Sequence, residues 1–359
     1  MRNMIELNKE KVGILIPTFN RKSFLENALQ SVCQQTYASV EIIVIDNGSA
    51  DGTAVFMSSI SDPRVRYVVN EGNIGMIGSI NKGISLFSDE VEWCTILGDD
   101  DLLDRDFIKN LLQTAAVSAA KSIVHSHRIF IDKAGNRIRE ATLSPHEETA
   151  FEYMKMRAHF KRETYLTGVL FNRKAFMEIN GYPVFLTGLA TDDAFIFALS
   201  LKDRLVFERN ALAYIRIHEG AESASCTDGM KKLQTLKQFE EYCRKVASKS
   251  ENVTRNQLEE FEGLLRRFLK VANSYWWIRT VHCEVDQENK DYKQLSELLS
   301  LVRRNKDTYT FRVRFSITFR TLTGIFLEVY PSYRTCWDNA ISVSRLFGKY
   351  LGKAIYAGR

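Results

Sequence analysis

Short apolar runs alternate with segments of helical periodicity over the first 130 residues, and this alternation constrains the fold more than any other feature. The apolar runs lie at 12–16, 40–45, 65–69 and 91–97. Segments 22–35 and 74–87 carry apolar residues at a three-and-four spacing, which is typical of helices. Strands that are apolar on both faces occur in parallel sheets covered by helices on both sides. The sequence therefore predicts an α/β fold.

The composition is that of a soluble globular protein, with 359 residues, 45% of them hydrophobic and 26% charged. No apolar run approaches the roughly 20 residues that a membrane-spanning helix needs. The first eleven residues mix charges with single apolar residues, so we do not interpret them as a signal peptide. The six cysteines are scattered without CxxC spacing, and we expect reduced thiols in a cytoplasmic protein rather than disulfides or a zinc site.

Polar residues follow three of the four predicted strands. The segment 17–21 follows the first strand, Asp46 follows the second, and the triplet Asp99-Asp100-Asp101 follows the fourth. Parallel sheets bind ligands at the carboxyl ends of their strands. Three adjacent carboxylates repel one another unless a cation neutralises them, and Mg2+ or Mn2+ is held by one or two carboxylates together with substrate phosphates. The triplet therefore predicts a metal site for a phosphorylated substrate, with a solvated acidic turn as the alternative.

The pattern changes twice further along the chain. Between residues 121 and 218 it is mixed, with strand-like segments at 122–131, 165–171 and 212–217 and a predicted helix at 194–201. After about residue 228 it becomes helical, with apolar residues at a three-and-four spacing over 258–275 and 295–302. We therefore predict a catalytic domain over 1–228 and a mainly helical C-terminal region over 229–359.

Seven motifs in the right order resemble those of the family 2 glycosyltransferases, which have the GT-A fold. Residues 12–21 are similar to the opening strand and "PTYNR" turn of that family, and residues 41–53 to its "EIIVVDdgStDgT" stretch. The remaining similarities are at 31–37, 73–83, 97–103, 191–193 and 214–218. The resemblance implies a mixed, mainly parallel sheet flanked by helices, followed by a helical C-terminal extension. Gly98 departs from the family pattern, because many members have the first metal-binding aspartate there.

The resemblance also implies a nucleoside-diphosphate sugar donor, Mn2+ or Mg2+, and residues for both. Those implied for the nucleotide are Pro17, Thr18, Asn20, Arg21, Asp46, Asn73, Asn81 and Asp99; those implied for the metal are Asp99, Asp100, Asp101 and His218. A metal on the diphosphate would stabilise the charge that develops on the leaving group. Asp46 has an alternative role as a turn-capping residue, and His218 has a structural alternative. Which aspartate of the triplet is the principal metal residue stays open.

Asp192 and Asp193 are the candidates for the general base, which takes the proton from the acceptor hydroxyl. We favour Asp192, because Phe195 gives it the apolar spacing that follows the family aspartate. The alternative role for these residues is to begin the helix, since Thr-Asp-Asp before an apolar run is a helix-start pattern.

The net charge of +5 is unevenly distributed, because residues 303–359 contain 11 Lys or Arg and 3 Asp or Glu. Alternating basic and bulky residues in this segment predict peripheral attachment to the inner face of the cytoplasmic membrane, where a lipid-linked acceptor would reside. An ordinary helical subdomain or an oligomer contact is the alternative. The localised charge does not indicate nucleic-acid binding.

Taken together, the motifs predict an inverting, metal-dependent glycosyltransferase of bacterial cell-surface polysaccharide or lipopolysaccharide synthesis, acting on a glycan or lipid-linked acceptor. A sugar-nucleotidyltransferase and a non-catalytic glycan- or membrane-binding protein on the same fold are the alternatives. The first of these needs a glycine-rich loop after the first strand, which residues 17–21 lack. The non-catalytic alternative predicts a degraded metal site or a missing base, whereas the sequence has both the triplet and Asp192.

Overall fold

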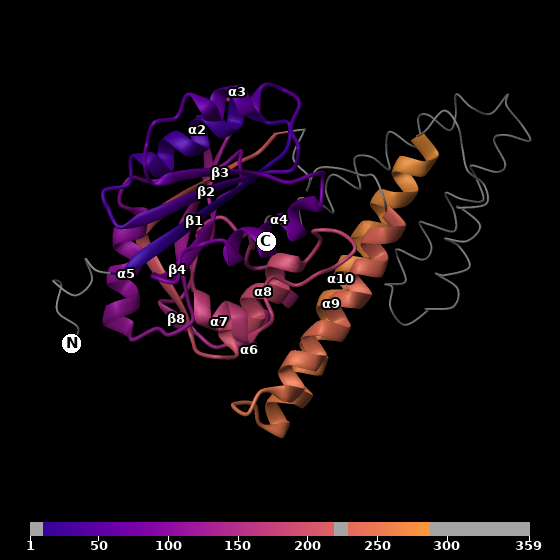
Figure 1. Cartoon of the computed structure of the whole chain (residues 1–359). Coiled ribbons are helices and arrows are strands. Elements are labelled where there is room, and N and C mark those ends of the chain that lie inside the picture. Colours follow the sequence, from indigo (N-terminus) through magenta and orange to yellow (C-terminus); the bar gives the residue numbers. More distant parts are fainter. Residues whose placement is uncertain (1–9, 219–228, 287–359) are drawn as a thin grey trace, which may run out of the picture.

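The computed structural model describes residues 10–218 and 229–286, and within them the strands form one ten-stranded sheet (Figure 1). The main strand order is β3-β2-β1-β4-β9-β6-β10-β5, with β7 paired to β6 and β8 to β10. The strands are β1 (Lys11–Thr18), β2 (Val40–Asp46), β3 (Val65–Val69), β4 (Val91–Ile96), β5 (Leu102–Leu103), β6 (Ile123–Ile131), β7 (Arg137–Glu140), β8 (Glu147–Glu148), β9 (Val169–Asn172) and β10 (Leu205–Arg216).

Strands β1 to β4 form the parallel half of the sheet that the apolar runs predicted. β1 pairs in parallel with both β2 and β4, and β2 pairs in parallel with β3. The register sets Thr18 beside Asp46, so the last residues of β1 and β2 are neighbours. Strand β9 then runs antiparallel between β4 and β6, and β10 runs parallel to β6. The predicted mixed, mainly parallel sheet is confirmed.

Helices cover both faces of the sheet, as the absence of a polar face on β1 and β2 requires. The helices are α2 (Lys22–Cys33), α3 (Thr53–Ser58), α4 (Gly75–Ser85), α5 (Phe107–Ser118), α6 (Ala150–Ala158), α7 (Arg173–Glu178), α8 (Thr191–Ser200), α9 (Gly229–Lys249) and α10 (Arg255–Asp286). Apolar residues of α2, α3 and α5 form the core on one face. Those of α4, α6, α7 and α8 form the core on the other face, together with α9 and α10.

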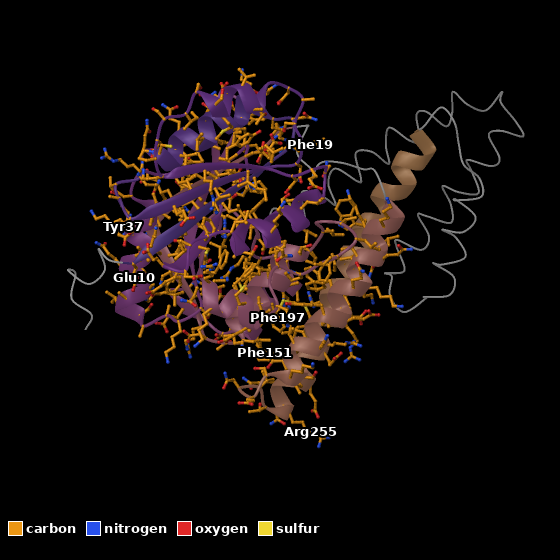
Figure 2. The ribbon with its side chains drawn as sticks, viewed as in Figure 1. Glu10, Phe19, Tyr37, Phe151, Phe197 and Arg255 are labelled. Carbon is orange, nitrogen blue, oxygen red and sulfur yellow. The ribbon has the colours of Figure 1, made fainter. Side chains whose placement is uncertain are left out.

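The long helices α9 and α10 share the core of the α/β part instead of forming a separate one. Phe261 of α10 stacks on Phe197 of α8, with ring centroids 4.9 Å apart, and Phe151 of α6 packs edge-on against both. Figure 2 shows Phe151 and Phe197 on the side of the sheet that these helices cover. Phe261 belongs to the apolar face that the spacing over 258–275 predicted. The domain boundary after residue 228 stays a prediction.

Residues 287–359 lie outside the described part of the chain, and with them the predicted helix at 295–302 and the basic segment 303–359. Within residues 10–218 and 229–286, no helix combines the length and the apolar character needed to cross a membrane.

Strand β10 differs most from its prediction, because it begins at Leu205 rather than at residue 212. Its pairing with β6 shifts register between Glu208 and Leu212. The polar residues at this irregularity interrupt the apolar pattern, so the first half of the strand could not be predicted from that pattern. The strand ends at Arg216, which contacts Asp100 and Asp101 of the acidic triplet after the carboxyl end of β4.

Candidate functional site

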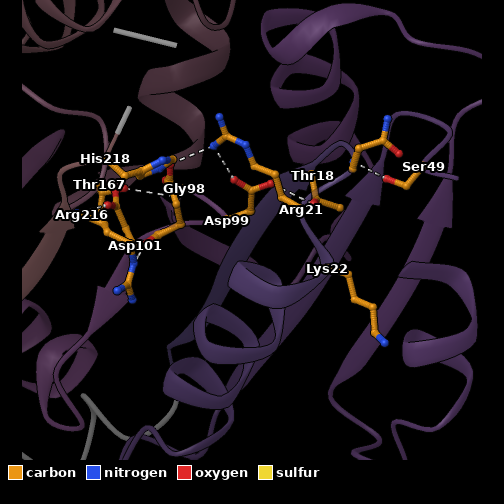
Figure 3. Close-up of polar contacts among 12 residues, drawn as sticks. Thr18, Arg21, Lys22, Ser49, Gly98, Asp99, Asp101, Thr167, Arg216 and His218 are labelled. Carbon is orange, nitrogen blue, oxygen red and sulfur yellow. Dashed lines mark hydrogen bonds and ion pairs between the residues drawn. The ribbon is translucent and has the colours of Figure 1, made fainter. Parts of the chain in front are cut away.

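The ends of β1 and β4 bring Thr18, Arg21 and Asp99 into direct contact. Thr18 Oγ1 donates a hydrogen bond to Asp99 Oδ2 over 2.9 Å, and Arg21 Nη1 lies 3.2 Å from Asp99 Oδ1 (Figure 3). Burial raises the pKa of Asp99 to about 6, against the opposing effect of Arg21. A threonine and an arginine 78 or more positions earlier in the chain therefore favour the ionised form of this carboxylate, which burial disfavours.

Asp100 is the most accessible carboxylate of the triplet, with 16% of its side chain exposed against 9% for Asp99. Its Oδ2 lies 2.8 Å from Arg21 Nη1 and 2.9 Å from His218 Nε2. The imidazole of His218 packs on the ring of Phe24, with centroids 4.8 Å apart. The predicted metal residues Asp100 and His218 thus meet, although 118 positions separate them in the sequence.

Asp101 is buried and is held by β10. Its Oδ1 accepts a hydrogen bond from the backbone N–H of Arg216 over 2.8 Å, and its carboxylate also contacts Thr167. Burial, and next the charge of Asp100, raise the pKa of Asp101 to about 7. The guanidinium of Arg216 does not neutralise it, since Nε donates instead to the Asp100 carbonyl oxygen. Asp101 therefore anchors the loop.

Gly98 leaves room for the carboxylates of Asp100 and Asp101, which lie close to its backbone. A Cβ atom at this position would lie 3.1 Å from Asp100 Oδ1 and 3.1 Å from Asp101 Oδ2, which is closer than side chains ordinarily approach. The backbone N–H of Gly98 donates to Thr167 Oγ1 over 3.0 Å. The departure from the family pattern at this position thus coincides with a tightly packed loop.

The donor set of the triplet fits a hard divalent cation. Among the described residues, no group of three or more His, Cys, Asp or Glu side chains is arranged to hold a metal without further ligands. Mg2+ and Mn2+ need only one or two protein carboxylates when substrate phosphates complete the shell. Burial raises the pKa values of Asp99 and Asp101, the charge of Asp100 raises them further, and a bound cation would favour the ionised carboxylates. Asp100 and His218, whose side chains meet, are the residues that would hold it.

The predicted nucleotide residues Asp46 and Asn20 form hydrogen bonds with the loop that follows β2. Asp46 is buried and accepts hydrogen bonds from the backbone N–H and Oγ of Ser49, at 2.9 and 2.6 Å, and from the hydroxyl of Tyr67 at 2.5 Å. Asn20, at a φ of 53°, accepts from the backbone N–H of Ala50 over 2.7 Å. The loops after β1 and β2 are thereby joined. Asp46 has the turn-capping contacts of its alternative role.

The remaining predicted nucleotide residues have different surroundings. Pro17 is half-buried near the end of β1. Asn73 is exposed and accepts from the backbone N–H of Gly75 over 2.8 Å, so it shapes the turn into α4. Asn81 has both ends of its amide bonded to the backbone of Tyr182. Its side chain therefore holds another segment of the chain rather than facing the loops after β1 and β2.

The two candidate bases on α8 have distinct environments. Asp193 is 6% exposed and forms a two-point ion pair with Arg157, at 2.5 Å to Nε and 2.9 Å to Nη2, while Tyr153 donates to it over 2.8 Å. Asp192 is half-buried, lacks such an ion pair, and accepts from the hydroxyl of Tyr182. Burial raises the pKa of Asp192 to about 6. Neither aspartate is the N-cap residue of α8, because Ala190 occupies that position.

One short segment joins Asp192 to the acidic triplet. The backbone of Leu166 hydrogen-bonds to the Asp192 carboxylate, while the next residue, Thr167, contacts Gly98 and Asp101 through its hydroxyl. The adjacent residues Leu166 and Thr167 therefore link the candidate base Asp192 to the loop of the triplet, although Asp192 and Asp101 are 91 positions apart in the sequence.

Sequence reasoning missed Thr167, Tyr182, Tyr67 and Arg216. Arg216 stood inside the quoted motif at 214–218, so that motif was a usable signal. The other three have no pattern of their own, and only tertiary contacts identify them.

Part of this chain is similar in sequence to known glycan-synthesis proteins. A β-1,3-glucosyltransferase acting on GalNAc(5)-diNAcBac-PP-undecaprenol in Campylobacter jejuni is 33% identical over 133 residues, which are 36% of this chain and 41% of that protein. The succinoglycan biosynthesis protein ExoO of Rhizobium meliloti is 29% identical over 113 residues, which are 32% of each chain. The chain thus spans less than half the length of these relatives.

Solved structures share the fold at low sequence identity. S. aureus TarS in complex with UDP has a TM-score of 0.58 and 14% identity, over 90% of this chain and 91% of that one. Mannosyltransferase PcManGT from Pyrobaculum calidifontis, in complex with GDP-Man and Mn2+, has a TM-score of 0.50 and 15% identity, over 90% and 88%. Residues 13–179 match the family model "Glycosyl transferase family 2", so this part of the chain carries a domain similar to that family.

Proposed function

We propose that this chain transfers a sugar from a nucleoside-diphosphate sugar to a hydroxyl of an acceptor, with inversion at the anomeric carbon. The observation that supports the proposal is the adjacency of Leu166, which contacts Asp192, and Thr167, which contacts the loop of the triplet. A base on one side and a diphosphate station on the other is the arrangement that in-line displacement at a sugar carbon needs.

In the proposed reaction Asp192 accepts the proton of the acceptor hydroxyl as that oxygen bonds to the anomeric carbon. The bond from the anomeric carbon to the diphosphate oxygen breaks on the opposite face, and its electron pair stays on the nucleoside diphosphate. With a pKa of about 6, the Asp192 carboxylate is ionised at pH 7 and still basic enough to share a proton. Asp193 is committed to Arg157 and serves the fold.

The donor would lie along the carboxyl ends of β1, β2 and β4. Thr18, Arg21 and Asp99 would face the ribose and phosphates, and Asp100 and His218 would hold Mn2+ or Mg2+. Bound there, the metal would neutralise the charge that develops on the departing diphosphate. Arg21, which already bridges Asp99 and Asp100, would orient these carboxylates before the donor binds.

For the acceptor we propose a glycan or lipid-linked glycan of a bacterial cell surface, handled on the cytoplasmic side of the membrane. The C. jejuni relative is named for an undecaprenol-linked acceptor, and ExoO is named for succinoglycan biosynthesis. The basic segment 303–359 supports a peripheral contact with anionic lipid. Flotation of the full chain with vesicles that contain or lack phosphatidylglycerol tests that contact.

The activity is tested with purified full-length chain and a panel of UDP-glucose, UDP-GlcNAc, UDP-GalNAc and GDP-mannose, with and without Mn2+. A bound donor at 100 times its Kd should stabilise the fold by about 2.7 kcal/mol in a thermal-shift measurement. We expect one donor to stabilise the protein and to release its nucleoside diphosphate. A nucleotidyltransferase would instead release pyrophosphate from a nucleoside triphosphate and a sugar phosphate. Failure of every nucleotide to stabilise the protein would contradict the proposal.

A further inference from the structure

Tyr182 lies in the core beside α8, yet its hydroxyl reaches the half-buried Asp192. The residue has no exposed surface, and its ring packs against Phe195 with centroids 5.1 Å apart. From that position the hydroxyl donates a hydrogen bond to Asp192 Oδ1. A donor fixed in the core leaves the carboxylate little freedom to rotate.

Asn81 of α4 holds the backbone of Tyr182 from the other side. Asn81 Nδ2 donates to the Tyr182 carbonyl oxygen over 2.9 Å, and the Tyr182 N–H donates to Asn81 Oδ1 over 2.8 Å. Gly181, at a φ of +82°, allows this approach, because a Cβ there would lie 2.5 Å from Asn81 Oδ1. Helix α4 packs on β1, the strand that ends at Thr18. The tyrosine is therefore fixed relative to the donor side of the sheet.

Four groups face the Asp192 carboxylate. Burial has the largest effect and raises the pKa of Asp192, and the charge of Asp193 also raises it. The Tyr182 hydroxyl, the backbone of Leu166 and the buried Arg128 lower it. Arg128 donates its own hydrogen bonds to the carbonyl oxygens of Thr167 and Tyr165. Tyr182 is thus the side chain that both donates a hydrogen bond to the carboxylate and favours its ionised form.

We propose that Tyr182 is a positioning residue, which orients the Asp192 carboxylate for proton abstraction and is itself set by Asn81. The inference rests on the proposed function, because it concerns the base of that reaction. In this proposal Tyr182 and Asn81 act through Asp192 and not by contact with the donor or the acceptor.

The test is Tyr182→Phe, which keeps the ring in the core and removes only the donor. Loss of a hydrogen bond to a charged group should raise the pKa of Asp192, and so shift the midpoint of the acid limb of the kcat/KM profile upward by roughly one pH unit. We expect kcat to fall about tenfold, a part of what a general base contributes, with an unchanged KM for the donor. The matched control is Tyr153→Phe, which removes the corresponding hydroxyl from Asp193. It should leave the acid limb in place.

A second measurement needs no substrate. The folded-state pKa of Asp192, about 6, lies above its ordinary value, so the folded protein binds this proton more tightly and loses stability as pH rises toward 6. In Tyr182→Phe this loss should extend to about pH 7, and adding Asp192→Asn should abolish the extension. If Tyr182→Phe and Tyr153→Phe gave the same pH profiles and the same unfolding curves, the inference would be overturned. A chain inactive with every donor would refute the proposed function, while the unfolding curves would still decide the role of Tyr182.

Discussion

Adjacent aspartates on α8 offer a matched pair of substitutions that separates folding from chemistry. Asp193→Asn removes the charge that faces Arg157, whose guanidinium makes two contacts of 2.5 and 2.9 Å with the carboxylate. Both side chains are largely buried, at 6% and 15% exposed. Asp192→Asn removes a carboxylate that has no such partner. The two variants carry the same chemical change at neighbouring positions.

The cost of Asp193→Asn follows from the burial of the pair. Removing one partner of a buried ion pair costs about 3–5 kcal/mol, because the other charge stays desolvated without compensation. Asparagine keeps the volume and one acceptor oxygen, so we expect the lower end, about 3 kcal/mol. For a large domain this corresponds to a fall in Tm of roughly 6–12 °C. Sugar transfer measured well below the new Tm should persist.

Asp192→Asn should have the opposite effects. Because burial raises the pKa of Asp192 to about 6, its ionised form at pH 7 opposes folding, and the neutral amide removes this penalty. We expect an unchanged or higher Tm at pH 7 and a loss of transfer by a factor of about 10²–10⁴. The loss should appear in kcat, while the Kd for the nucleoside diphosphate stays the same.

Thermal unfolding by calorimetry and nucleoside-diphosphate release, both at pH 7, measure these effects in one set of preparations. The reasoning would be refuted if Asp193→Asn kept its Tm and lost transfer while Asp192→Asn remained active. That result would exchange the roles of the two residues. If both variants lost stability equally, the difference in environment would not govern either role.

Three further changes test other parts of the structure. Asp100→Asn should raise the Mn2+ concentration for half-maximal transfer at least about tenfold, measured after EDTA treatment, and equal Mn2+ dependence would move the metal contact elsewhere. Gly168→Ala should lower the free energy of unfolding, measured by chemical denaturation, by about 2–4 kcal/mol, because φ is +97° and the new Cβ would lie 2.6 Å from a serine Oγ of β6. The control Gly48→Ala has a φ of +84° and no atom within 4 Å of the new Cβ, so it measures the backbone strain alone. Phe261→Ala should cost about 3–5 kcal/mol if α10 is integral to the core, whereas the exposed Arg255→Ala should change the Tm little.

Much of the fold was predictable because its signals are local. The residues of β1 and β2 are apolar on both faces, and this property appears in five or six consecutive letters. The helical spacing of α2, α4 and α10 is equally local. The direction of β9 and the start of β10 were not predictable, because they depend on pairing partners and on a register shift between Glu208 and Leu212.

The site divides in the same way. The sequence by itself determined which residue types end each strand, and hence that Thr18, Asp46 and the acidic triplet lie at one edge of the sheet. Only the tertiary structure decided that Asp100 meets His218, and that Asp193 is held by an arginine while its neighbour is not. The physical reason is that burial and ion pairing depend on atoms brought together across tens of residues. Two adjacent aspartates look alike in a sequence, and only their surroundings in the folded chain distinguish them.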